Sequence, residues 1–397
     1  MDSEMAKAPL SVIVLCILSV ITGCASPNIR GTGDLGVIIE RSSGSVQIVD
    51  GTDCVSLGRV TGLGDLSHAS LVFSKDQRFV FVFGRDGGIT KIDLLLGKVV
   101  KRVIQVTNSI GGAISADGKL IAVQNYEPGG VKIFDSKSLN LISQIVAPIG
   151  ATGKPSRVVG LADLPDNKFA YSLFDSNEID IVDVKKPSDP SVTRFKNIGK
   201  SPYDALASPD GRYYIAGLYG EDGLAIVDNW NPESGARRIL SGYGRGEKNL
   251  PVYKMPHLRG WSLSGELAFF PSIGHHEVIM ADAHNWNQIT SIKVAGQPVF
   301  VMADPSGRRV WVNFAYPDND KVQVIDVPTR SIIATLSPGK AILHMEFTSK
   351  GDAVWLSSRD DNKVVVIDTS SLKVINELSA ESPSGIFFSW RSSRIGM

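Results

Sequence analysis

The sequence is poor in cysteine and histidine and has no surplus of charge of either sign. Its 397 residues include three cysteines, six histidines, 41 basic and 41 acidic side chains. Equal numbers of opposite charges exclude the bulk attraction for nucleic acid that a basic protein shows, so an anionic partner must meet a local cluster. Three cysteines cannot build a disulfide framework or a cysteine-rich zinc site. Stability must therefore come from packing, and 43% hydrophobic residues suffice for a large core.

Apolar runs long enough to span a bilayer are also lacking. The N-terminal run from Pro9 to Ile21 has signal-peptide length and is too short to cross a membrane comfortably. It is followed by Thr22, Gly23 and Cys24, an ending that resembles the lipobox of bacterial lipoproteins. The alternative is an ordinary cleavable signal with a chance cysteine.

The lipobox interpretation predicts the following organisation. Residues 1–23 are a signal peptide, Cys24 is lipidated, and residues 24–35 carry the lipid and form a tether. Ala25 stands where an aspartate would favour the inner membrane. We therefore expect a periplasmic protein that is lipid-anchored to the outer membrane. Met5 is an alternative start, because the residues before it include two acidic side chains that a signal peptide does not favour.

An apolar segment ending in aspartate recurs eight times along the chain. Successive aspartates lie 42 to 54 residues apart, which is the length of a four-stranded propeller blade. The runs between them are rich in Val, Ile, Phe and Tyr, lack a helical period and are separated by Asp or Gly turns, as expected of β-meanders. The eight segments are Val46–Asp50, Ile89–Asp93, Val131–Asp135, Ile179–Asp183, Leu224–Asp228, Val278–Asp282, Val322–Asp326 and Val364–Asp368.

The two ends of the series complete one another. The first unit starts directly at Gly36–Glu40 without its upstream strands, whereas the chain closes on an unmatched apolar run, Ser384–Trp390. Pairing of these two runs would remove the open sheet edge. The sequence therefore predicts an all-β fold, an eight-bladed β-propeller over residues 36–397 whose last blade is closed by N- and C-terminal strands. Two separate sheet domains fit less well, because no linker interrupts the series.

Propeller geometry brings two kinds of loop to one face of the central channel. These are the loops that precede the first strand of each blade and the loops that join the second strand to the third. Histidine, arginine and tyrosine are frequent among them, which favours a flat anion that carries a metal, because these side chains supply nitrogen ligands, carboxylate clamps and aromatic walls. The candidates at these positions are His68, Arg85, Tyr126, Arg157, Tyr203, Asp204, His257 and Arg259.

A lone histidine is more often a packed or surface residue than a ligand. His68 is the first candidate nonetheless, because it precedes a strand at the channel and small neighbours, Ser67, Ala69 and Ser70, would let a planar group approach. His257 holds the same relative place in another unit. The repeated aspartates look catalytic only until their recurrence in every blade is noticed, and a carboxylate that caps the following turn explains all eight. No nucleophile elbow, HExxH or CxxCH motif occurs in the sequence.

Several short segments resemble the haem d1 propeller of cytochrome cd1 nitrite reductase. They include His68 with the stretch GRDGGITKIDL over residues 84–94, Pro155-Ser156-Arg157, PHLRG over residues 256–260, and Pro383-Ser-Gly-Ile-Phe, all in the same order. The reductase carries a pair of histidines over the distal face of its haem. This sequence has Leu164-Pro165 and Pro202-Tyr203 in those places, and it has no c-type haem motif.

These departures point away from nitrite reduction and toward the NirF family of haem d1 biosynthesis proteins, which the whole pattern closely resembles. The resemblance implies a periplasmic protein that binds haem d1 or its iron-containing precursor and opens side-chain lactones to give dihydro-haem d1. In that family His68 would be the proximal iron ligand, while Arg85, Arg157 and Arg259 would hold acidic side chains. Tyr126 and His257 would complete the cofactor site. Tyr203 and Asp204 would stand on the distal side, with Asp204 as base.

Three other functions remain open at this point. A carrier without chemistry would deliver haem d1 to cytochrome cd1 nitrite reductase or to other assembly proteins. The related dehydrogenase of the last step normally has a c-type haem domain, which this sequence does not show. A plain propeller scaffold would bind no tetrapyrrole. We expect a membrane contact through the lipid and no nucleic-acid partner.

Overall fold

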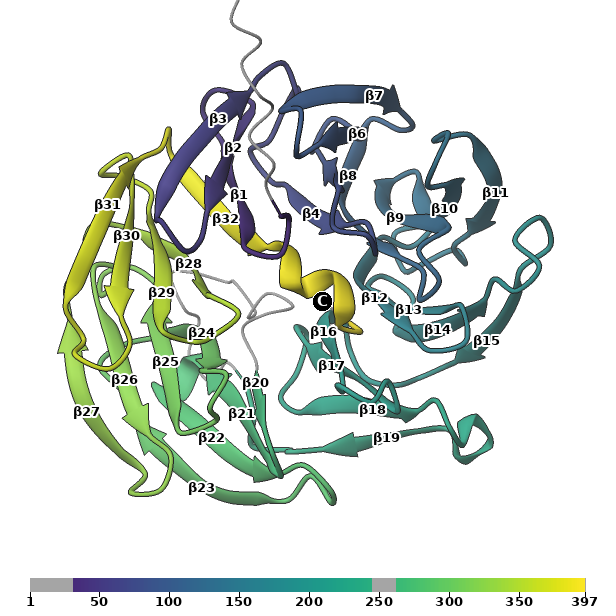
Figure 1. Ribbon diagram of the computed structural model, residues 1–397. Helices are drawn as coiled ribbons and strands as arrows, with labels where there is room; N and C mark the ends of the chain where they lie inside the picture. The colour runs from purple at the N-terminus through teal and green to yellow at the C-terminus, as the bar shows by residue number, and fades with distance from the viewer. Residues whose placement is uncertain (1–30, 245–261, 397) are drawn as a thin grey trace, which may run out of the picture. The chain divides into compact units, whose positions relative to one another are not determined.

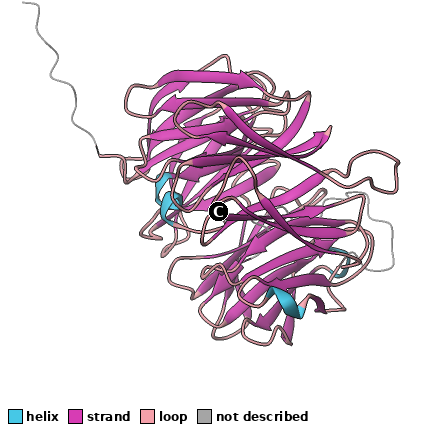
Figure 2. Cartoon of the chain, turned by 90° about the vertical axis from the view of Figure 1, so that its right-hand side faces the viewer, coloured by secondary structure: helices cyan, strands magenta, loops and turns pink. Residues whose placement is uncertain are grey.

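Eight four-stranded antiparallel sheets make up the fold, arranged as blades around a central axis (Figure 1). The structure is a computed structural model and describes residues 31–244 and 262–396. Figure 2 shows that this part of the chain is almost entirely strand and turn, with helix limited to short segments. An eight-bladed β-propeller was the architecture predicted from the repeats, and it is confirmed.

Each blade consists of four strands that follow one another from the channel outward. They are β4 Ser70–Phe73, β5 Phe79–Phe83, β6 Gly88–Asp93, β7 Lys98–Ile104; β8 Asn108–Ile114, β9 Leu120–Glu127, β10 Gly129–Asp135, β11 Leu141–Val146; β12 Val158–Leu164, β13 Lys168–Leu173, β14 Glu178–Asp183, β15 Ser191–Phe195; β16 Pro202–Ala207, β17 Tyr213–Leu218, β18 Leu224–Asp228, β19 Ala236–Ile239; β20 Ser262–Ser264, β21 Leu267–Ser272, β22 Glu277–Asp282, β23 Gln288–Lys293; β24 Pro298–Ala303, β25 Arg309–Phe314, β26 Val322–Asp326, β27 Ser331–Leu336; β28 Ile342–Phe347, β29 Ala353–Ser358, β30 Lys363–Asp368, β31 Val374–Ser379; and β32 Pro383–Phe388, β1 Leu35–Glu40, β2 Ser45–Asp50, β3 Val55–Val60. The short 3-10 helices are η1 Pro232–Ser234, η2 Ile273–His275 and η3 Ser389–Ser393.

The core lies between neighbouring blades. Val37 and Val46 of the closing blade pack in one cluster with Leu71 and Val80 of the next, and all four side chains are buried. Because each middle strand is covered on both faces, its sequence is apolar almost throughout, which explains the continuous apolar runs of the repeat. The outermost strands have only one covered face, and β7 is exposed along most of its length. Burial of apolar surface between the blades stabilises the fold by about 25 cal/mol for each Å² removed from water.

The third strand of every blade ends on an aspartate, and each of these carboxylates accepts main-chain N–H groups of the turn that follows. This is the capping role that the repeat predicts, and it is confirmed in all eight blades. The donors are Thr52 and Asp53 for Asp50, Leu95 and Leu96 for Asp93, Ser138 for Asp135, Lys185 for Asp183, Trp230 for Asp228, His284 and Asn285 for Asp282, Thr329 for Asp326, and Ser371 for Asp368.

One blade is built from both ends of the propeller chain. Strand β32 pairs antiparallel with β1, with Gly36 opposite Phe388 and Ile38 opposite Ile386, so the last strand becomes the innermost strand of the first blade (Figure 1). The predicted closure is confirmed. It satisfies the backbone groups that β1 would otherwise leave open at a sheet edge.

The segment after β32 crosses the channel at the end where the inner strands finish. Arg391 of η3 forms a buried ion pair with Glu346, near the end of β28. The Gly396 N–H donates to the Asp163 carboxylate near the end of β12, at 2.9 Å. Lys75, which follows β4, donates to the Ser392 carbonyl. These contacts join the ends of three inner strands, and Figure 1 shows η3 lying near the centre of the ring.

The described residues contain no helix that is both long and apolar enough to cross a membrane. The predicted signal peptide, the lipidation site Cys24 and the candidates His257 and Arg259 lie outside the described residues. Their assignments stay predictions.

Candidate functional site

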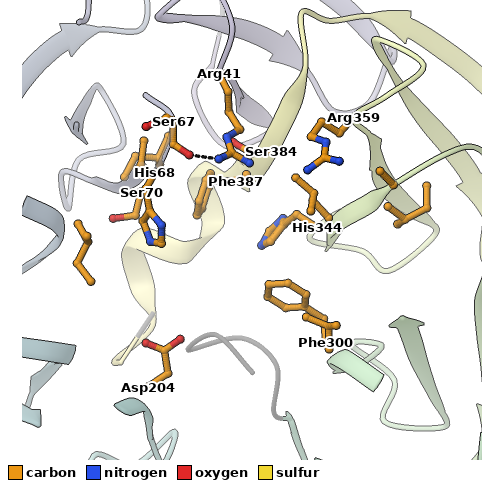
Figure 3. Close-up of a pocket in the computed structure, with 18 of the residues that line it drawn as sticks. Arg41, Ser67, His68, Ser70, Asp204, Phe300, His344, Arg359, Ser384 and Phe387 are labelled. Atoms are coloured by element: carbon orange, nitrogen blue, oxygen red, sulfur yellow. Dashed lines mark hydrogen bonds between the residues drawn. The ribbon is translucent and has the colours of Figure 1, made fainter. Parts of the chain in front are cut away.

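A cavity of about 380 Å³ opens where the inner strands begin, on the channel face predicted to carry function (Figure 3). This volume falls within the range of small-molecule sites. Its walls are mainly apolar, and the apolar side chains come from six blades and the turns between their strands. The apolar lining residues are Ala69, Leu71, Val72, Ile110, Leu161, Val299, Phe300, Phe314, Ala315, Ala341, Ile342, Leu343 and Phe387.

His68 lies in a bend just before β4, half-buried, and lines this cavity. The bend is fixed on either side. The Ser67 N–H donates to the Asp65 carboxylate at 2.8 Å, and Arg41 donates to the Ser67 carbonyl. The Ser67 hydroxyl and N–H lower the pKa of Asp65 below its ordinary value. The small residues predicted to flank the histidine line the cavity with it, so a flat ligand can approach the imidazole.

Two arginines line the same cavity from neighbouring blades. Arg41 comes from the turn between β1 and β2, and Arg359 from the turn between β29 and β30. Burial, and then the positive charge of Arg359, lowers the pKa of Arg41. Arg359 forms an ion pair with Asp360 at 2.6 Å, and its side chain is 34% exposed. Two cations held close enough to repel each other would be stabilised by an anion between them, and a carboxylate can accept hydrogen bonds from both.

Asp204 enters the cavity from the opposite side. It lies on β16, is only 7% exposed and lines the cavity below the two histidines in Figure 3. Its negative charge helps to raise the pKa of the Tyr203 and Tyr126 phenols, whose burial is the largest cause of the increase. A buried carboxylate beside an apolar cavity can accept a proton from substrate or water.

His344 lines the cavity from β28 and is 6% exposed. Its ring stacks on Phe387 at 5.4 Å between centroids and meets Phe300 edge to face, also at 5.4 Å. Its Nδ1 accepts the Ile386 N–H at 3.2 Å. His344 is thus both packed between aromatic rings and part of the cavity wall.

A second group of predicted residues lies beside the cavity without lining it. Arg85 stacks over Tyr126 at 5.6 Å, and the Tyr126 hydroxyl hydrogen-bonds to Tyr203. Tyr203 packs against Phe174 and Tyr219 at 5.9 Å from each ring. We call these five residues the aromatic cluster.

Arg157 borders the aromatic cluster and is already paired. Its guanidinium binds the Asp175 carboxylate through Nε and Nη2, at 2.9 and 2.6 Å, and stacks over Phe174 at 4.3 Å. These hydrogen bonds raise the pKa of Arg157. Of the predicted site residues that the structure describes, His68 and Asp204 therefore line the cavity, whereas Arg85, Tyr126, Arg157 and Tyr203 are not among its lining residues. The roles given to all of them remain predictions.

Arg41 was missed by the sequence reasoning, although a signal for it exists. The loop between the second and third strands of each blade is expected to face the channel, and Arg41 occupies that loop in the closing blade. The first unit looks incomplete in the sequence, which hides the equivalence of its loop with the others. Gly396 also lines the cavity, and no periodic pattern in the sequence predicts that position.

The described residues offer no group of three or more His, Cys, Asp or Glu side chains that could hold a metal ion on their own. An iron tetrapyrrole does not need such a group, because the macrocycle supplies the equatorial nitrogens and the protein adds an axial ligand. One accessible imidazole, apolar walls and two arginines fit a flat, iron-containing, carboxylated ligand.

Comparisons with known proteins agree with this geometry. The cytochrome D1 heme domain family matches residues 30–392. "Protein NirF" of Pseudomonas aeruginosa is 60% identical over 395 residues, which cover 99% of this chain and 100% of that protein. "Protein NirF" of Stutzerimonas stutzeri is 56% identical over 97% of this chain and 99% of that protein.

Among solved structures, dihydro-heme d1 dehydrogenase NirN in complex with DHE superposes with a TM-score of 0.79 and 27% identity. The match covers 93% of this chain and 78% of that one. The resemblance predicted from short segments thus extends over the whole propeller. The chain belongs to the cytochrome D1 heme domain family, and within it to the NirF proteins.

Proposed function

We propose that this protein binds haem d1, or its immediate iron-containing precursor, in the central cavity and acts late in haem d1 biosynthesis. One observation carries the proposal. The apolar cavity is lined by an imidazole, a buried carboxylate and two neighbouring arginines, His68, Asp204, Arg41 and Arg359. Family membership and the complex of the related dehydrogenase with DHE support the same class of ligand.

His68 is the proposed proximal iron ligand. Its side chain is the half-buried imidazole of the cavity, and small residues on both sides leave room for a macrocycle face. Bound iron would supply electron withdrawal from the ring system. The protein's own part is to hold the macrocycle flat between the apolar walls and to keep water away from most of it.

The proposed reaction is the opening of a side-chain lactone to give dihydro-haem d1. Addition of water to a lactone carbonyl breaks the ring C–O bond and leaves a carboxylate and a hydroxyl, so water is the only co-reactant. Asp204 would take the proton from the attacking water. Arg41 and Arg359 would bind the carboxylate that forms, and this interaction strengthens as negative charge develops.

A carrier that delivers haem d1 to cytochrome cd1 nitrite reductase is the second candidate. One observation favours it. Tyr203, the predicted catalytic partner of Asp204, belongs to the aromatic cluster and does not line the cavity. The cavity thus holds more groups for binding than for chemistry.

Incubation of the lipid-free protein with late haem d1 precursors separates the two candidates. We expect the product mass to increase by one water with wild type, and to stay unchanged with Asp204→Asn, which preserves side-chain shape. An absorbance shift without any change in mass would support the carrier function and contradict the enzymatic one. Arg41→Gln should weaken precursor binding, whereas Arg237→Gln, a change at an exposed arginine of β19, should not.

The proposed cellular location rests on the sequence features of the N-terminus. Lipidation of Cys24 would hold the protein in the periplasm at the outer membrane, close to other haem d1 assembly proteins and to the reductase. Cys24→Ser should move the protein from the membrane fraction to the soluble periplasmic fraction. Retention in the membrane fraction would contradict the lipid anchor.

A further inference from the structure

Two histidines from different blades face the same cavity, and their surroundings differ. His68 stands in the bend before β4, while His344 lies within β28, and the closing blade separates the two blades that carry them (Figures 1 and 3). His344 is held on several sides. Its main-chain N–H donates to the Ser357 hydroxyl at 2.8 Å, and its ring lies between Phe300 and Phe387.

The hydrogen bond from Ile386 fixes the proton position on the His344 ring. A neutral imidazole has one nitrogen that carries a proton and one that accepts. The main-chain N–H of Ile386 can only donate, so Nδ1 of His344 must be the acceptor, and the ring proton is on Nε2. The tautomer thus follows from this one hydrogen bond.

This tautomer separates the chemistry of the two histidines. A histidine that binds a metal through Nε2 needs a lone pair there, and it normally donates a proton from Nδ1 to an acceptor. His344 has the reverse arrangement, because its Nδ1 accepts a hydrogen bond from a main-chain N–H, which can only donate. Iron coordination by Nε2 of His344 would require breaking the bond to Ile386. A hydrogen bond donated from Nε2 requires no such change.

The C-terminal strand and helix hold this arrangement in place. Ile386 and Phe387 both belong to β32, which is hydrogen-bonded to β1. Arg391 of η3 lies over the Phe387 ring at 5.4 Å and is anchored by its ion pair with Glu346. Glu346 and His344 are two residues apart on β28. The histidine is therefore oriented by elements that the rest of the propeller keeps fixed.

We propose that His344 is a substrate-positioning residue whose Nε2–H donates a hydrogen bond to a peripheral oxygen of the bound tetrapyrrole, and that it does not bind the iron. This inference rests on the proposed function for the identity of the ligand. The oxygen is that of a carbonyl, lactone or carboxylate substituent on the macrocycle edge. The two histidines then have separate tasks, since His68 meets the metal and His344 sets the rotation of the ring in its plane.

The first test concerns the protein without ligand. Long-range proton–nitrogen NMR on protein labelled with ¹⁵N-histidine identifies the protonated nitrogen of each imidazole, and His344→Gln assigns the signal. We expect the proton of His344 on Nε2. A signal with the proton on Nδ1 would overturn the inference, whatever ligand the cavity takes.

The second test compares variants with haem d1 and with its iron-free chromophore. His344→Leu removes the donor and keeps an apolar side chain, and we expect binding of both ligands to weaken about fivefold to tenfold, the effect of one hydrogen bond. His344→Gln, which retains an N–H donor, should recover most of that loss. His68→Ala should weaken haem d1 alone and alter its iron spectrum. His284→Leu, at an exposed turn, is the matched control.

The outcomes are distinct. An iron spectrum altered by His344→Gln, or a binding loss confined to the iron-containing ligand, would make His344 a metal ligand and refute the positioning role. Wild-type affinity in His344→Leu would also refute it. If wild type bound neither ligand, the proposed function itself would be overturned. A circular dichroism spectrum and a melting temperature like those of wild type establish that the Leu variant is folded.

Discussion

The two ends of the propeller's strands follow opposite rules. Where the third strands finish, eight blades carry an aspartate that accepts a main-chain N–H from the next turn, two or three residues further on. Where the inner strands begin, the blades differ, and the cavity takes a histidine from one blade and a carboxylate from another. Repetition therefore marks what every blade needs to fold, and departure from it marks what the whole molecule needs to act.

The largest effect on stability should come from the end of the channel where the inner strands finish and η3 is anchored. Glu346→Ala leaves Arg391 buried without its partner, and we expect the free energy of unfolding to fall by about 3–5 kcal/mol. Denaturant titration followed by tryptophan fluorescence measures it. The matched control is the double change Glu346→Gln with Arg391→Met, which removes both charges and should cost less. A loss below about 1 kcal/mol in the single variant would show that the ion pair does not anchor η3.

A pair of aspartates compares the two ends directly. Asp135→Ala removes hydrogen bonds from the N–H and hydroxyl of Ser138, at 2.7 and 2.6 Å, and should lower the free energy of unfolding by about 1 kcal/mol without changing ligand affinity. Asp204→Asn should leave stability equal or higher and abolish product formation. The comparison would be broken if Asp135→Ala abolished turnover, or if Asp204→Asn destabilised the fold by a similar amount.

The smallest effect concerns the aromatic cluster and alkaline pH. Burial raises the pKa of Tyr126 and Tyr203 above the ordinary value of about 10, and the negative charge of Asp204 adds to the increase in both. In the unfolded chain these phenols ionise near that value, while in the folded protein they stay protonated. Their contribution to stability is therefore complete below about pH 10 and is lost as pH rises above it.

Phenolate absorbance measures this behaviour. The double variant Tyr126→Phe with Tyr203→Phe lacks two phenols that should stay protonated in the folded protein. The number of phenols that ionise before alkaline unfolding should therefore be the same in this variant as in wild type. A smaller reversible phase in the variant would show that both hydroxyls are open to solvent.

The sequence was most informative where a pattern repeats. Strand period, terminal aspartates and the missing strands of the first unit predicted the blades, their capping and the closure, because each is a local requirement of every sheet. His68 and Asp204 were also expected to reach the channel, since the order of strands in a blade determines which loops face it, and both line the cavity. Tyr203 precedes Asp204 on the same strand and alternation sends its side chain to the other side, toward the aromatic cluster.

Other features needed three dimensions. Arg157 was assigned to the ligand from the sequence, but its guanidinium is paired with Asp175. The two residues are eighteen positions apart, and nothing in the sequence indicates that they are in contact. The role of His344 depends on a main-chain N–H from residue 386, which any amino acid except proline could supply. Hydrogen bonds to the backbone leave little trace in a single sequence.

The closing strand also sets an order of events during synthesis. Strand β32 is the last of the strands to leave the ribosome, yet it pairs with the first, and the Glu381 N–H meets the Glu40 carboxylate across 341 positions of sequence. Contacts so distant along a chain form late in folding, because the ends must find each other. Ile386 and Phe387 arrive with that strand. A propeller interrupted before closure would therefore lack a finished cavity wall, so the protein gains the ability to hold its ligand only when the ring is complete.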